Sequence, residues 1–148
     1  MKKKINIMPM GGDGLRFKKY GYKNPKPLIN IKGKPMFVWS SKSLPNLNRW
    51  IFIVPKKFQN NSLFKKNVKK YFKRCKIIYL RSKTKGQAIT TLKANKYLKK
   101  NDQIFVNSCD TFFNYDKSKL KKKLKINDII VFTTKNNSFH IKKPNSFG

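Results

Sequence analysis

Directly after the apolar run INIMP (residues 5–9) comes the stretch MGGDGLRF (residues 10–17). A short apolar run of this kind indicates a buried strand. Glycines that follow it let the backbone approach a ligand closely, because glycine has no Cβ and tolerates a positive φ. The free N–H groups of such a turn bind anions. We therefore predict a phosphate-binding loop that includes Gly11, Gly12 and Gly14.

Two cations follow the glycines. Arg16 carries a planar guanidinium that suits phosphate oxygens, and Lys26 lies between Pro25 and Pro27, which stiffen the chain around it. A purely structural turn needs no paired cations, so we predict that Arg16 and Lys26 act on the bound phosphates. The carboxylate of Asp13 inside the loop would repel a phosphate unless magnesium bridges the two.

The order of these motifs resembles that of sugar-1-phosphate nucleotidyltransferases, also called nucleotide-sugar pyrophosphorylases. Their N-terminal part reads roughly Gly-Gly-x-Gly-x-Arg, then Pro-Lys-Pro-Leu, then Gly-Lys-Pro-Met. This chain carries the second motif at residues 25–28 and the third at residues 33–36. Two further matches are KGQA at residues 85–88 and NSCD at residues 107–110, so the resemblance extends over nearly the whole chain.

The resemblance implies a reaction and a role for each matched residue. A sugar-1-phosphate oxygen would attack the α-phosphorus of an NTP and release pyrophosphate. Arg16 and Lys26 would be the catalytic cations, and Asp110 would bind the Mg²⁺ cofactor. Nucleotide binding would fall to the glycine loop and to Gly86 and Gln87. Leu15 departs from the small hydroxyl residue usual in the family.

Apolar strands and amphipathic helices alternate along the rest of the chain. This alternation predicts an α/β three-layer sandwich with a mostly parallel sheet, and the resemblance makes it the Rossmann-like nucleotide-diphospho-sugar transferase fold. We expect ligands beyond the carboxyl ends of the strands. A turn is expected over residues 135–138, and the expected elements are strands at 4–8, 50–54, 77–80, 104–107 and 129–133, helices at 34–44, 58–72, 87–98 and 117–124, and an extended piece at 28–31.

A length of 148 residues suits a single domain over residues 1–148. The chain contains no apolar run long enough to span a membrane, and we expect a cytoplasmic protein with reduced Cys75 and Cys109. Family members are considerably longer, so we expect a fragment or a minimal member that lacks the C-terminal part of the family. The sequence determines neither the base nor the sugar, nor the oligomeric state.

The charge is extreme, with 37 Lys and Arg against five acidic residues and a net charge of +32. A field of this strength attracts polyanions, so non-specific polyanion binding is expected. Aromatics among the lysines, such as Phe64, Tyr71 and Phe72, keep a second hypothesis open, that of a basic nucleic-acid-binding protein. A third is a catalytically silent nucleotide-sugar binder or a glycosyltransferase on the same fold.

Overall fold

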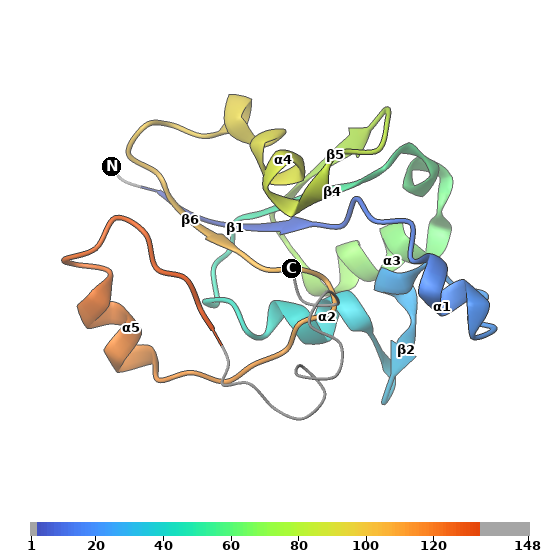
Figure 1. Cartoon of the computed structure of the whole chain (residues 1–148), viewed down its shortest axis with the longest axis horizontal. Coiled ribbons are helices and arrows are strands. Elements are labelled where there is room, and N and C mark those ends of the chain that lie inside the picture. Colours follow the sequence, from blue (N-terminus) through green and yellow to red (C-terminus); the bar gives the residue numbers. More distant parts are fainter. Residues whose placement is uncertain (1–2, 134–148) are drawn as a thin grey trace. The chain divides into compact units, whose positions relative to one another are not determined.

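The computed structural model of the chain describes residues 3–133. Its contacts divide the chain into two compact units, Met1–Asn114 and Tyr115–Gly148. The first unit contains a sheet of four parallel strands in the order β5-β4-β1-β6 (Figure 1). These strands are β1 (Lys4–Pro9), β4 (Trp50–Pro55), β5 (Cys75–Leu80) and β6 (Gln103–Val106).

Both faces of this sheet are apolar, because alternate side chains of β1 and β4 point to opposite sides. Ile7 and Ile53 lie on one face in a buried cluster with Ala94, and Met8 and Phe52 lie on the other. Figure 1 shows α4 (Gly86–Leu92) on one side of the sheet and α2 (Met36–Ser41) and α3 (Ser62–Tyr71) on the other. The predicted three-layer α/β sandwich with a parallel sheet is therefore confirmed.

The larger of the two clusters is built on aromatic rings. Phe37, fully buried, contacts the rings of Phe52, Phe64 and Phe72 at centroid distances of 5.7 to 5.9 Å. Trp50 stacks on Phe52 at 5.5 Å. Aromatic pairs at such distances add to the free energy of burial, and here they fix α2 and α3 against the strands that lead to the loops described below.

The remaining elements are short. In the first unit they are α1 (Leu15–Lys19), the 3-10 turns Lys26–Leu28, Lys56–Asn60 and Asn95–Tyr97, and an antiparallel pair of β2 (Asn30–Ile31) and β3 (Lys34–Pro35). The second unit contains α5 (Lys117–Lys123), whose first turn is capped by the Asp116 carboxylate. Between residues 3 and 133, no helix is both long and apolar enough to cross a membrane.

A strand pair and a cap shorten two of the predicted helices. The helix predicted over 34–44 begins only at Met36, because residues 34 and 35 pair with β2 across a turn in which Lys32 and Gly33 have φ of 46° and 80°. In the 58–72 stretch, Asn61 starts a new helix by accepting a hydrogen bond from the Phe64 N–H at 2.8 Å.

Three other elements differ from the expected ones. The helix over 87–98 ends at Leu92, and the extended piece at 28–31 is a strand only at residues 30 and 31. The strand predicted over 129–133 is absent from the described residues, where Ile129 and Val131 are 82% and 76% exposed. The turn expected over 135–138 lies outside the described residues, and the single-domain assignment stays a prediction.

Candidate functional site

A cavity of about 300 Å³ lies beyond the carboxyl ends of β1 and β6. Such positions are where open α/β sheets bind ligands. Six of the eight site residues predicted from the sequence line it, and Gly14 and Arg16 do not. The lining residues are Pro9, Met10, Gly11, Gly12, Lys26, Pro27, Lys83, Thr84, Gly86, Gln87, Thr90, Ser108, Cys109 and Asp110.

Gly11 and Gly12 have different surroundings within the loop. A Cβ on Gly11 would lie 3.1 Å from Leu80 Cδ1 and 3.3 Å from Thr90 Oγ1, so a side chain here would press the loop away from β5 and α4. A Cβ on Gly12 would meet no atom within 4 Å. Gly11 therefore lets the loop pack against Leu80 and Thr90, and Gly12 leaves open space beside the cavity.

Gly14 acts on the site through Lys26. Its φ of +66° is strained for residues with a side chain, and a Cβ here would lie 3.0 Å from Lys26 Cβ. Gly14 is also the cap from which α1 begins. The glycine thus permits the segment with Lys26 to lie against the loop, although Gly14 itself does not line the cavity.

Lys26 and Asp110 form an ion pair across the cavity, with 2.5 Å between Nζ and Oδ2. Their side chains are 22% and 36% exposed, so the pair is partly shielded from water. Burial raises the pKa of Asp110, but the hydrogen bond and charge of Lys26 outweigh it and hold that pKa below its usual value. Asp110 is therefore a carboxylate at neutral pH.

Arg16 lies outside this group. It is exposed on α1 and does not line the cavity. Its predicted role in binding phosphates stays a prediction. The structure places the α1 helix that carries Arg16 directly after the glycine loop.

Asp13 has a cationic partner at this site. Lys83, from the segment between β5 and α4, pairs with the Asp13 carboxylate at 3.0 Å. The hydrogen bond and charge of Lys83 lower the pKa of Asp13. Its negative charge is thereby offset by a lysine that itself lines the cavity, which reduces the repulsion that the sequence predicted for a phosphate.

A buried polar network holds the loop that carries Asp110. Asn107 Nδ2 donates to Ser40 Oγ at 3.0 Å and to the Thr111 carbonyl at 2.9 Å. Ser40 Oγ donates to the carbonyls of Ser108 and Thr111. Since Ser40 belongs to α2, this helix fixes the turn over 107–111 and with it the position of the carboxylate.

The other wall of the cavity is the start of α4. Thr90 Oγ1 donates to the Gly86 carbonyl at 2.9 Å and lies 2.5 Å from Thr84 Oγ1. These bonds tie the segment before α4 to the helix itself. Gly86 and Gln87 are held at the cavity in this way, and the exposed Gln87 side chain carries no hydrogen bond among the described residues.

Sequence reasoning missed four polar residues of the cavity, Lys83, Thr84, Thr90 and Ser108. Ser108 was within reach, because it lies two residues before Asp110 in the matched NSCD motif. Lys83 is one lysine among many, and no local pattern distinguishes it. Thr84 and Thr90 flank Gly86 and Gln87, so threonines on either side of a predicted binding segment were the only available signal.

The donor set limits which metal this site can hold. Residues 3–133 contain no group of three or more His, Cys, Asp or Glu side chains, and Asp110 is the carboxylate on the cavity wall. Mg²⁺ is commonly bound by one or two carboxylates together with substrate phosphates and water. A lone Asp110 fits that manner of binding and does not fit a cage made of protein ligands alone.

The aromatics behind the nucleic-acid hypothesis are mostly core residues. Phe64 is fully buried, Phe72 is 7% exposed, and Tyr71 packs against the same cluster. Rings in these positions are not available for stacking on bases. The positive charge remains, but the aromatic part of that hypothesis has no support in α3.

Comparison with solved structures identifies two enzymes with this fold. One is the nucleoside-diphosphate-sugar pyrophosphorylase from Vibrio cholerae RC9, with a TM-score of 0.59 and 26% identity over 79% of this chain and 53% of that one. The other is the 4-diphosphocytidyl-2C-methyl-D-erythritol synthase from Anaerococcus prevotii DSM 20548, with a TM-score of 0.59 and 17% identity over 85% and 52%.

Both enzymes are nucleotidyltransferases, and the chain has their Rossmann-like fold. The chain spans about half the length of each. No family model and no curated protein sequence matches it.

Proposed function

We propose that this protein is a nucleotidyltransferase that joins an NTP to a sugar-1-phosphate and releases pyrophosphate. The observation that carries the proposal is the single cavity lined by the glycine loop, the Lys26–Asp110 pair and the Gly86–Gln87 segment. The likeness to a nucleoside-diphosphate-sugar pyrophosphorylase at 26% identity supports it. The choice of a sugar-1-phosphate as the acceptor substrate rests on the sequence motifs.

In this reaction the protein supplies position and charge. An oxygen of the sugar-1-phosphate attacks the α-phosphorus of the NTP, the new P–O bond forms, and the bond to the leaving pyrophosphate breaks. No covalent intermediate with the enzyme is needed. Catalysis of this kind depends on orientation and on neutralising the phosphate charge.

Five residues of the cavity have a part in that scheme. Backbone N–H groups at Gly11 and Gly12 bind phosphate oxygens, for which the open space beside Gly12 leaves room. Lys26 neutralises the α-phosphate or the incoming sugar phosphate, and the Gln87 amide binds an edge of the base. Asp110 is the residue that would hold Mg²⁺, which when bound offsets the negative charge of the phosphates.

The Lys26–Asp110 pair holds two opposite charges side by side in the cavity. Lys26 Nζ and Asp110 Oδ2 lie 2.5 Å apart. An incoming triphosphate with its cation offers Lys26 and Asp110 partners of opposite charge. Binding therefore exchanges one ion pair for two charge contacts, and the pair keeps the lysine near the phosphate position until then.

The test begins with binding. ATP, GTP, CTP, UTP and dTTP, each with Mg²⁺ at fixed ionic strength, are added to the full chain, and the melting temperature is measured. A ligand that binds only the folded state raises it by mass action. We expect one nucleotide to raise it most. An equal rise with pyrophosphate or sulfate would contradict a nucleotide site.

Catalysis is tested by pyrophosphate release from the preferred NTP with glucose-1-phosphate, mannose-1-phosphate and galactose-1-phosphate. Lys26→Ala should reduce the rate by about a hundredfold or more, the loss expected for one preorganised charge contact. The matched control is Lys65→Ala, an exposed lysine of α3 outside the cavity. Equal losses in the two variants would show that net charge, rather than a site, binds the substrate.

A further inference from the structure

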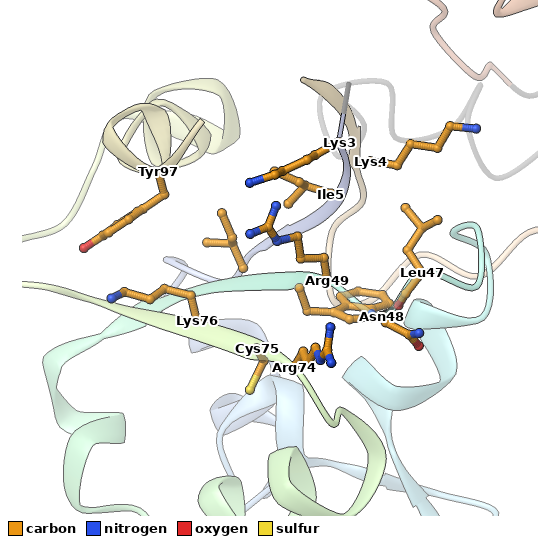
Figure 2. A pocket seen from close by; sticks show the side chains of 12 residues that line it. Lys3, Lys4, Ile5, Leu47, Asn48, Arg49, Arg74, Cys75, Lys76 and Tyr97 are labelled. Atoms are coloured by element: carbon orange, nitrogen blue, oxygen red, sulfur yellow. Dashed lines mark hydrogen bonds between the residues drawn. The ribbon is translucent and has the colours of Figure 1, made fainter. Parts of the chain in front are cut away.

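A second and larger cavity, of about 780 Å³, lies at the opposite edge of the sheet, where β1, β4 and β5 begin. Figure 2 shows its side chains, most of which come from the first residues of these strands and the segments before them. Five cationic residues line the cavity: Lys3, Lys4, Arg49, Arg74 and Lys76.

The register of the sheet brings the two arginines together. Trp50 pairs with Cys75 in the parallel ladder of β4 and β5, so the residues just before them, Arg49 and Arg74, are neighbours. The Trp50 N–H donates to the Arg74 carbonyl at 3.1 Å, and the Asn6 N–H donates to the Arg49 carbonyl at 3.0 Å. Parallel strands begin at the same edge, so basic residues at their starts gather on one side of the protein.

These charges are not neutralised by ion pairs. Residues 3–133 contain two ion pairs, Lys26–Asp110 and Lys83–Asp13, both at the candidate site. The Asp102 carboxylate accepts a hydrogen bond from the backbone N–H of Lys3, a residue that lines the second cavity. Backbone N–H groups of Lys99 and Lys3, and then the charges of Lys3 and Arg49, lower its pKa. One carboxylate therefore faces several cations, and the cavity keeps a strong positive potential.

The use of arginine sets this cavity apart from the general lysine surface. Only four of the 37 basic residues are arginine, and two of the four lie here. A guanidinium binds phosphate oxygens through two parallel N–H bonds, which an ammonium cannot do. The buried Ile5 and Ile51 form apolar walls, and such walls concentrate the field of charges that line a cleft.

The aromatic residues of the cavity argue against recognition of a base. The Tyr97 ring has the Lys76 ammonium 4.7 Å and the Lys96 ammonium 5.2 Å from its centroid. Trp50 is packed against Phe52 and Phe72 and is 7% exposed. Neither ring therefore offers a free face on which a base could stack. The groups in the cavity that remain to bind a ligand are its cations, which suit phosphate.

We propose that this cavity is a second anion site that binds a compact polyphosphate. The class includes free triphosphate and the triphosphate group of a nucleotide, whose several adjacent charges match several convergent cations. The site is separate from the cavity of the proposed function, so each can fail without the other.

Cys75 provides a local probe, because it lines this cavity and is exposed. Cys109 is buried, and burial raises the pKa of its thiol to about 12, so the neutral reagent iodoacetamide should modify only Cys75 in the folded chain. We expect sodium tripolyphosphate to slow alkylation of Cys75 in a saturable way at physiological ionic strength. The same measurement is made with ATP without Mg²⁺. It tests whether a nucleoside attached to the triphosphate changes the concentration that gives half protection of Cys75.

Two charge-matched variants decide whether the site is specific. Arg49→Gln with Arg74→Gln should raise the concentration that gives half protection by at least about tenfold, the loss expected when one charged hydrogen bond is removed. Lys65→Gln with Lys69→Gln removes the same charge from the exposed face of α3 and should leave that concentration unchanged. Lys26→Ala should also leave it unchanged, which separates this site from the proposed active site.

Equal protection by tripolyphosphate and ATP would support a site for the phosphate chain alone. Protection at lower ATP concentration would support a nucleotide as the source of that chain. Three results would overturn the proposal: no protection by either compound, an equal loss in both double variants, or protection only by a long single-stranded oligonucleotide.

Discussion

Substitutions at Gly11 and Gly12 should separate packing from ligand binding at adjacent positions. At Gly11 the added methyl group would lie 3.1 Å from Leu80 Cδ1 and 3.3 Å from Thr90 Oγ1. Overpacking of this kind costs about 1–3 kcal/mol, and alanine recovers about 0.4–1 kcal/mol by restricting the unfolded chain. Gly11→Ala should therefore lose about 1 kcal/mol of stability and melt about 3 °C lower.

Gly12→Ala should behave in the opposite way. No atom lies within 4 Å of the added methyl group, and the φ of Gly12 is outside the left-handed region. Stability should stay the same or rise by up to about 1 kcal/mol. The methyl group would occupy space that a phosphate needs to reach the backbone, so NTP affinity should fall about tenfold or more, as when one charged hydrogen bond is lost.

The assay is a melting curve of the wild type and of each variant, with and without the preferred Mg-NTP. A Gly12→Ala variant that melts as low as Gly11→Ala would show that the loop is packed on both sides. An undiminished NTP effect on Gly12→Ala would refute the close approach of the nucleotide to this backbone. Either result would remove the glycine loop from the proposed site.

Three further predictions concern single side chains. Asn107→Ala should lower the free energy of unfolding by about 1–3 kcal/mol, because it leaves buried partners without hydrogen bonds, and a urea titration measures this. Asp110→Asn should be less stable than the wild type at neutral pH, and the difference should shrink as pH falls through the lowered folded pKa of Asp110, since a protonated carboxyl no longer pairs with Lys26. Alkylation at pH 8, read by peptide mass spectrometry, should label Cys75 and spare Cys109.

Their controls are simple. The exposed Asn101 carries none of the network of Asn107, so Asn101→Ala should leave the urea midpoint unchanged. A wild type and an Asp110→Asn variant that keep the same difference in stability down to pH 2 would contradict the ion-pair explanation. Equal labelling of both cysteines would show that the segment around Cys109 opens in the native protein.

Most of the layered fold could be predicted from local pattern. The runs at residues 4–8, 50–54 and 77–80 are apolar on both faces, and such strands are buried only when helices cover both sides of a sheet. The isolated run at 129–133 shows the limit of the same reasoning. Ile129, Val131 and Phe132 are exposed, because a strand also needs a neighbouring strand and the sequence pattern does not supply one.

The candidate site divides in a similar way. Glycines after a strand and a lysine between two prolines can be recognised in the sequence without knowledge of the fold. Six of the eight predicted site residues therefore line the cavity. The exceptions are instructive, because Arg16 follows the loop in sequence yet lies outside the cavity. The position of Arg16 relative to the cavity depends on the direction that α1 takes after Gly14. The sequence motif does not specify this direction.

The sequence by itself predicted most of the order of the elements, the glycine loop after β1 and six of the residues that line the cavity beyond the carboxyl ends of the strands, because period, turn chemistry and charge are local properties. Only the tertiary structure decided that Lys26 pairs with Asp110, 84 positions away, that Ser40 holds the loop of Asp110, and that Arg49 lies beside Arg74. Such pairings depend on strand register and on the packing of α2, which are set by the whole core. In a chain with 37 basic residues, no local signal marks the few whose neighbours make them a site.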